Sequence, residues 1–522
     1  MTQLSTPPAQ QAAAMSHREI LGALRGLLLA MFVAMLSSTV VDNALPRIVT
    51  DLHGTQSGYT WIVVATLLAM TASTPIWGKL SDQFDKKTLV QTALGIYVLG
   101  SIAASVAQSM GVLITARAVQ GLGVGGVTAL VQVVIASMVP PRERGRYSGY
   151  IGATFAIATI SGPLIGGVLV DLPGLGWRSC FFVGIPVAAA AFVVLQRTLH
   201  LPSVRREVNV DYLGATLIVG GVSTLLIWVS LAGNQFAWAS LTSYGLVALG
   251  LAVLAVAIRV ETRFAADPII PPRLFRDRTT VLATVASIFV GVALFGATVY
   301  LSQYFQIARG MTPTHAGLMS IAMVGGLLVS SIVTGRIISV TGRWKNLLVG
   351  GMVLVVLGIF LLSFIDESTP LVEVAVFQAI LGIGLGATMQ NMILALQNNS
   401  APQDLGTSSA VVSFFRSMGG SIGVSALGAL LASRVAGKVQ DALAASGAPA
   451  GTHQSHQIPK VADLPEPMRH IYEHAFGTSI GELFLVSTAF AVAALVAVLF
   501  IKEVPLRTTL GSEPAQEPEL MG

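Results

Sequence analysis

Charged residues are scarce in this sequence. Only 11% of its 522 residues are charged, against about 25% in a typical soluble domain. A soluble chain of this length would fold as about three or four domains, and each would need a polar surface that this composition does not supply. A soluble enzyme, a disordered protein and a nucleic-acid-binding protein are therefore excluded. What remains is a polytopic membrane protein.

Motifs for metal, redox and nucleotide chemistry are missing as well. Cys180 is the single cysteine, so an internal disulfide is impossible, and no Cys/His cluster marks a metal site. The glycine-rich run 121–126 resembles a phosphate-binding loop, but it lies inside an apolar segment with no strand before it. We therefore expect no cofactor, no bound metal and no direct use of ATP. Because no catalytic constellation is present either, we expect that the protein is not an enzyme.

Long apolar runs, in contrast, are abundant. A helix needs about 20 mostly apolar residues to cross a membrane, and fourteen ranges meet this requirement. Their continuous apolar character excludes a transmembrane β-barrel, whose strands alternate. The ranges are 24–45, 60–77, 88–109, 112–138, 147–170, 179–196, 211–231, 242–259, 281–303, 316–336, 346–365, 372–397, 405–433 and 480–501.

The distribution of Lys and Arg predicts the orientation. Most of the 30 basic residues lie in segments that are cytoplasmic if the N-terminus is cytoplasmic, which is the bias that orients membrane proteins. We therefore predict a multi-pass protein of the plasma (inner) membrane with both termini inside. The net charge of +5 then needs no nucleic-acid partner. Residues 1–16 lack the charged start of a signal peptide.

Two segments between spans are long. The range 259–280 is basic and predicts a cytoplasmic linker, and 434–479 predicts an outer loop. We interpret this loop as a partly amphipathic surface segment, with a metal or pH-sensing site as the alternative. Its irregularly spaced histidines are His453, His456, His470 and His474.

The two halves of the chain repeat the same pattern of glycines and charged residues. The charged, glycine-containing segment 78–87 joins the second and third spans, and 335–345 joins the tenth and eleventh. The glycine-rich segment 117–125 in the fourth span aligns with 378–386 in the twelfth. Two matches in the same order indicate duplicated halves, as in many secondary transporters, with the seventh and eighth spans inserted between them.

This organisation predicts five regions. They are a cytoplasmic tail (1–23), an N-terminal six-helix bundle (24–200), two inserted transmembrane helices with a cytoplasmic linker (201–280), a C-terminal six-helix bundle that includes the loop 434–479 (281–502), and a cytoplasmic C-terminal tail (503–522).

Three motifs resemble the major facilitator superfamily, and the fourteen spans resemble its drug:proton antiporter family. The loop motif is similar at Gly78, Asp82, Lys86 and Lys87, although Asp85 stands where the family usually has a second glycine. The span-four motif is similar at Arg117, Gln120 and Gly121, and the span-five run at Gly162, Pro163, Gly166 and Gly167, which resembles the motif of exporters. The resemblance covers about residues 20–435 and the last span. It implies an all-α fold of two pseudo-symmetric six-helix bundles plus two inserted helices.

The first span departs from the family at its acidic position. The family usually has a carboxylate where this chain has Ser37, and Asp42 follows five residues later. Asp42 and Arg117 lie at similar depth in their spans, and a carboxylate beside an arginine can bind and release a proton. We hypothesise that Asp42 is the proton-coupling residue and that Arg117 modulates it. The alternatives are an interfacial Asp42 and an Arg117 that bridges to a backbone carbonyl.

The other motifs have physical roles to offer. We predict that Asp82, with Lys86 and Lys87, forms a cytoplasmic latch, a contact that breaks and forms again during transport. A carboxylate such as Asp82 is favourable near a helix N-terminus. The alternative is a charged turn that only fixes the topology. The small residues of the span-five run predict close packing and a bend between the halves, with ordinary bundle packing as the alternative. Polar and aromatic residues in mid-span are candidates for substrate contact or for packing, namely Tyr300, Gln390, Asn391 and Phe414.

Together these features predict a proton-coupled antiporter that exports amphipathic organic compounds, such as drugs, dyes and antibiotics, by alternating access. We expect a monomer in the lipid bilayer with protons and a small-molecule substrate as its partners. One alternative is a dedicated exporter of an endogenous lipid, siderophore or secondary metabolite. The others are a membrane-embedded enzyme or complex subunit, and a channel, which the duplicated halves disfavour.

Overall fold

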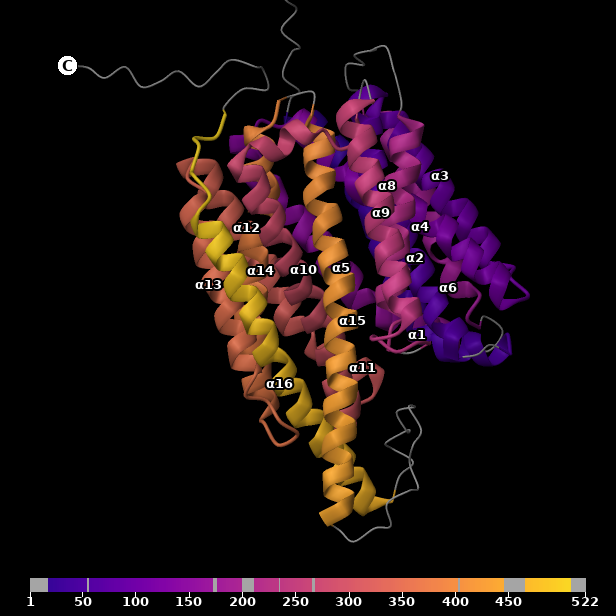
Figure 1. Cartoon of the computed structure of the whole chain (residues 1–522). Helices are drawn as coiled ribbons and strands as arrows, with labels where there is room; N and C mark the ends of the chain where they lie inside the picture. Colours follow the sequence, from indigo (N-terminus) through magenta and orange to yellow (C-terminus); the bar gives the residue numbers. More distant parts are fainter. Residues whose placement is uncertain are drawn as a thin grey trace, which may run out of the picture.

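The computed structural model describes residues 17–53, 56–171, 176–199, 211–233, 235–264, 268–401, 404–445 and 465–507. Within these residues the regular structure is helical (Figure 1), apart from one isolated β-bridge between Ala232 and Phe236. The predicted all-α membrane fold is confirmed.

The helices follow the predicted order. The first half contains α1 (His17–Asp51), α2 (Gln56–Gln83), α3 (Lys86–Ser105), α4 (Met110–Met138), α5 (Pro141–Asp171), α6 (Ser179–Phe182) and α7 (Gly184–Thr198). The inserted pair is α8 (Tyr212–Leu231) and α9 (Leu241–Arg263). The second half contains η1 (Pro272–Arg276), α10 (Arg278–Gln303), η2 (Tyr304–Ala308), α11 (Pro313–Met319), α12 (Ile321–Thr341), α13 (Lys345–Leu362), α14 (Leu371–Asn399), α15 (Leu405–Ala445) and α16 (Glu466–Leu499).

Short polar side chains define several helix starts. Asp85, Ser109 and Asp277 precede α3, α4 and α10, and each accepts a hydrogen bond from a backbone N–H in the first turn. Such caps satisfy donors that a helix leaves unpaired at its beginning. Asp85 thus serves as the α3 cap at the position where the related motif usually has glycine.

The number of membrane spans differs from the prediction. Among the described residues, twelve helical stretches are long and apolar enough to cross a membrane. The predicted spans 147–170 and 211–231 also lie on helices, α5 and α8, but their apolar stretches are only Gly149–Thr159 and Leu213–Val229. The count of fourteen is therefore not confirmed, while the fold class holds.

The predicted outer loop 434–479 is helical at both ends. Helix α15 continues to Ala445, and α16 already begins at Glu466. Ion pairs support these extensions, since Lys438 lies 2.8 Å from Glu482 and Arg469 lies 2.8 Å from Glu473. His453 and His456 lie outside the described residues.

The two halves pack in the same pattern. In the first half α4 packs against α2 and α3, and α1 packs against α5; in the second half α14 packs against α12 and α13, and α10 against α15. The aligned glycines Gly123 and Gly384 occupy matching contacts. A Cβ on Gly123 would lie 2.5 Å from the Tyr97 nitrogen in α3, and one on Gly384 would lie 2.5 Å from the Val355 nitrogen in α13. The sequence repeat therefore marks positions where the backbones must approach closely.

The halves meet mainly through α5 with α12 and α2 with α15, and less extensively through α4 with α15 and α5 with α14. The inserted helices α8 and α9 pack on each other, and α8 contacts both α2 and α15. Helix α1 begins and α16 ends at the same end of the bundle, the upper end in Figure 1. We call it the terminal end, and the opposite one the far end.

Candidate functional site

Asp82 caps the beginning of α15 from across the interface between the halves. Its Oδ1 accepts the Gly406 N–H at 2.9 Å, and its Oδ2 accepts the N–H and the hydroxyl of Thr407 at 3.0 and 2.8 Å. Because α15 begins at Leu405, these N–H groups have no partner within their own helix. The carboxylate therefore neutralises the positive end of the helix dipole, although it lies 324 residues away in the chain.

Two glycines bring α2 and α15 into backbone contact beside this carboxylate. A Cβ on Gly78 would collide with the Cβ of Ala410 and would lie 2.9 Å from the Gly406 oxygen. A Cβ on Gly406 would lie 2.5 Å from the Gly78 oxygen. The two glycines thus face each other, and the approach that they permit places Asp82 at the end of α15. We call Gly78, Asp82, Gly406 and Thr407 the latch.

The two predicted basic members of this motif have different surroundings. Lys86 attracts the Asp82 carboxylate electrostatically. Lys87 donates to the Gln196 carbonyl at 2.8 Å, which ties α3 to the end of α7 within the first half. The structure therefore brings Gly78, Asp82 and Lys86 together, whereas Lys87 contacts a different helix.

Arg144 forms a second link between the halves at the terminal end, although in the sequence it was only one of the basic residues that predict the orientation. Its side chain is buried and donates to the Gln397 Oε1 of α14 at 2.7 Å, and to the carbonyls of Ala136 and Val139 at 2.6 and 2.8 Å. Gln397 in turn donates to the Ser409 hydroxyl of α15 at 2.7 Å. Burial distinguishes Arg144 from the exposed Arg142 two residues before it, and no local sequence signal reports burial.

Arg117 lies in a buried polar network of the first half. It is 2% exposed, and it donates to the Gln120 Oε1 at 2.6 Å and to the Ile62 carbonyl at 3.5 Å. Gln120 donates to the Ser101 hydroxyl at 2.8 Å, and the Tyr97 hydroxyl is hydrogen-bonded to Ser101 and Ser37.

Ser37, which stands where the related family has its carboxylate, therefore lies in the same network as Arg117. Asp42 lies in α1, but its side chain is outside the described part of the structure. The pairing of Asp42 with Arg117 stays a prediction. The Ile62 contact corresponds to the alternative role of Arg117, a bridge to a backbone carbonyl.

The span-five run lies in α5, where Gly162 meets α1. A Cβ on Gly162 would collide with the Thr39 side chain, so this glycine is needed for the α1–α5 contact. Gly166 is buried in the same helix, and the positions of Pro163 and Gly167 are described only for the backbone. The run therefore packs two helices of the first half together. Its predicted bend between the halves stays untested.

The four substrate candidates lie on three helices. The Tyr300 hydroxyl of α10 donates to the Val424 carbonyl, and the Asn391 amide donates to the Ala387 carbonyl one turn earlier in α14. Phe414 is 3% exposed and packs in an apolar cluster with α8, and Gln390 is half-buried. In this conformation Tyr300 and Asn391 are hydrogen-bonded to backbone carbonyls and Phe414 packs against apolar side chains. The role of the four residues in substrate binding stays a prediction.

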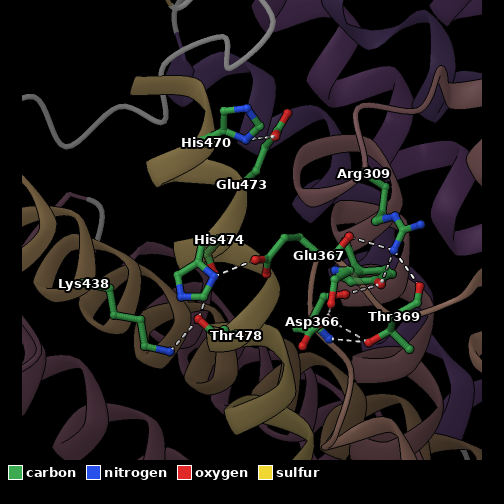
Figure 2. Close-up of polar contacts among 11 residues, drawn as sticks. Arg309, Asp366, Glu367, Thr369, Lys438, His470, Glu473, His474 and Thr478 are labelled. Atoms are coloured by element: carbon green, nitrogen blue, oxygen red, sulfur yellow. Dashed lines mark hydrogen bonds and ion pairs between the residues drawn. The ribbon is translucent and has the colours of Figure 1, made fainter. Parts of the chain in front are cut away.

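The far end carries a polar cluster that joins parts of the second half (Figure 2). Arg309 donates to the carbonyls of Glu367 and Thr369 at 2.8 and 2.6 Å, and the His474 Nδ1 of α16 lies 2.6 Å from the Glu367 Oε1. Asp366 accepts hydrogen bonds from Ser368 and Thr369, and the Ser368 hydroxyl is the main cause of its lowered pKa. The cluster fixes α16 to the turn between α13 and α14.

Comparison with known proteins gives a consistent picture. The family model of the Major Facilitator Superfamily matches residues 27–424. The chain is 33% identical over 498 residues to the efflux pump dotC of Dothistroma septosporum, and the match covers 93% of this chain and 84% of that protein. It is 32% identical over 418 residues to the multidrug transporter protein MdtP of Bacillus subtilis, and the match covers 80% of this chain and 76% of that protein.

The fold is also similar to a solved structure. The proton:xylose symporter XylE superposes with a TM-score of 0.59 at 13% identity, and the match covers 94% of this chain and 97% of that one. At this level of identity the likeness concerns the fold.

Proposed function

Because the chain belongs to the Major Facilitator Superfamily, we propose that it is a proton-coupled antiporter that exports amphipathic organic compounds, such as drugs, dyes and antibiotics. The observation that carries this proposal is the similarity, over most of the chain, to proteins named as an efflux pump and a multidrug transporter. The resemblance of the span-five run to the exporter motif supports the same direction of transport.

The bias of Lys and Arg supports an orientation in the plasma membrane with the terminal end in the cytoplasm. The latch and the Arg144 contact with Gln397 then lie at the cytoplasmic end. Both join the first half to the second, so the conformation is closed at that end. Substrate entry from the cytoplasm requires α15 to separate from α2, which breaks the three hydrogen bonds of Asp82.

The proton gradient supplies the energy in this proposal. Inward movement of one proton contributes about 2.3 kcal/mol per 100 mV of membrane potential, in addition to the pH term. Asp42 is the proposed proton-coupling residue, with Arg117 nearby as a fixed positive charge. The protein acts as a monomer and uses no cofactor.

The test is uptake of a cationic dye into inverted membrane vesicles with an acidic interior. The wild type is compared with Asp42→Asn, and with Asp441→Asn as a control that removes an exposed carboxylate near the far end. We expect accumulation by the wild type and the control, and its loss in Asp42→Asn. Accumulation that persists in Asp42→Asn would refute Asp42 as the coupling residue. If the wild type accumulates no dye from a broad panel, the proposed substrate range is wrong.

A further inference from the structure

The segment that follows the inserted helices contacts the beginning of α15. We call residues 268–277, which lead from α9 to α10, the strap. Arg273 Nη2 lies 2.9 Å from the Oδ1 of Asp404, and Asp404 directly precedes the first residue of α15. The Phe275 ring packs edge-on against Phe415, with 6.4 Å between the ring centroids. The strap therefore contacts α15 at its first residues and again about three turns along it.

Glu261 near the end of α9 fixes the course of the strap. Its carboxylate is buried, and its two oxygens accept the N–H groups of Ile269 and Ile270, both at 3.0 Å. A carboxylate that accepts two backbone N–H groups makes strong, charge-assisted hydrogen bonds. Ile269 is itself buried. The first residues of the strap are therefore held both by the hydrogen bonds to Glu261 and by the burial of an apolar side chain.

The inserted pair also contacts α2 beside the latch. Lys79, the neighbour of Gly78, attracts the Glu261 carboxylate electrostatically. Ile76 of α2, Ile218 of α8 and Phe414 of α15 belong to one apolar cluster. The inserted pair and the strap thus bridge α2 and α15 at the terminal end. When α2 separates from α15, either the electrostatic attraction between Lys79 and Glu261 must weaken or the contact of Arg273 with Asp404 must break.

We infer that Glu261 and Arg273 are positioning residues of the transport cycle, which act through the strap to hold the cytoplasmic end closed. Asp82 of α2 binds the first turn of α15, and Arg273 of the strap binds Asp404, the residue before that turn. The inference rests on the proposed function, which identifies the terminal end as the cytoplasmic end that must open for substrate entry. It assigns to the inserted helices a role in setting how readily that end opens.

The experiment measures distances between spin labels across the terminal end. Labels are placed at Arg197→Cys in α7 and Arg343→Cys beyond α12, both exposed, in a Cys180→Ala background, and the protein is reconstituted in nanodiscs without substrate or gradient. The variants are Arg273→Asp, Asp404→Arg and the double charge reversal. Arg276→Asp, an exposed arginine in the same short helix with no described side-chain partner, is the matched control.

We expect each single reversal to raise the ratio of open to closed molecules about two- to fivefold, which is the size of one ion pair whose arginine is exposed to solvent. The double reversal should restore the wild-type ratio, and Arg276→Asp should leave it unchanged. Glu261→Gln should raise the ratio as well, because one of the two oxygens that accept the Ile269 and Ile270 N–H groups is replaced by an NH₂ group, which cannot accept a hydrogen bond. Transport rates of the same variants in vesicles should follow the change in this ratio.

Wild-type distance distributions in Arg273→Asp and Asp404→Arg would overturn the inference, whether or not the protein transports dye. A change that the double reversal does not restore would also overturn it, since the ion pair would then not be its cause. If the distances change as expected but no proton-driven export is found, the proposed function fails and the role of the strap in closing this end stands.

Discussion

Asp82→Asn should open the terminal end of the protein. The substitution removes the negative charge from the start of α15, where interaction with the helix dipole is worth up to about 2 kcal/mol in a partly buried site. The amide also replaces one carboxylate oxygen by an NH₂ group, which cannot accept; with this group toward the Gly406 N–H, one hydrogen bond of about 1 kcal/mol is lost. The sum of about 3 kcal/mol corresponds to roughly a 100-fold fall in the ratio of closed to open molecules.

The spin-label pair at positions 197 and 343 measures this ratio directly. Asp85→Asn is the matched control, because Asp85 is a nearby carboxylate that caps α3 through Thr88 and makes no described contact with α15. We expect longer distances in Asp82→Asn and wild-type distances in Asp85→Asn. If Asp82→Asn keeps the wild-type distribution, the carboxylate does not hold the two halves together, and the reasoning from the helix terminus is wrong.

Three further predictions concern other contacts. Gly121→Ala should lower the melting temperature in detergent, because its Cβ would collide with the Thr66 carbonyl at a cost of about 1–3 kcal/mol, whereas Gly95→Ala, with open space around it, should leave the temperature unchanged. Arg144→Met should increase the open population in the spin-label assay, since it removes the hydrogen bond to Gln397; an unchanged population would show that this bond does not help to close the terminal end. Asp366→Ala should lower stability at neutral pH, where the lowered pKa of Asp366 makes its carboxylate stabilising. This contribution is full above the ordinary Asp pKa of about 3.9 and is lost as pH falls through the lower folded-state pKa, so equal pH dependence of the melting temperatures of mutant and wild type in acid would contradict it.

The helical framework followed from local features of the sequence. Each predicted apolar range is mainly helical, although 179–196 is divided between α6 and α7 and 316–336 between α11 and α12. A run of about 20 apolar residues is stable in a membrane only when its backbone groups are satisfied within the segment. The duplicated glycines were visible in the sequence too, since close helix contacts require small residues wherever they occur. Gly123 and Gly384 fulfil this role at matching places in the two halves.

The boundaries outside the membrane were harder to predict. The range 434–479 has the polar composition of a loop, yet the structure continues α15 and starts α16 within it. Lys438 and Glu482 pair between these two helices, and such pairing depends on the helices lying side by side. Hydropathy along the chain contains no information on that arrangement.

By itself the sequence determined the fold class, the duplication and the charged and polar residues that are candidates for function. Hydropathy, glycine spacing and charge are properties of local segments. Only the tertiary structure decided which partners those residues meet. Asp82 was recognisable as a conspicuous carboxylate, but its partners in α15 lie 324 residues away. The burial of Arg144 against Gln397 and the contact of Arg273 with Asp404 likewise depend on how helices from both halves pack. Packing is a property of the assembled bundle, and no single segment of the chain specifies it.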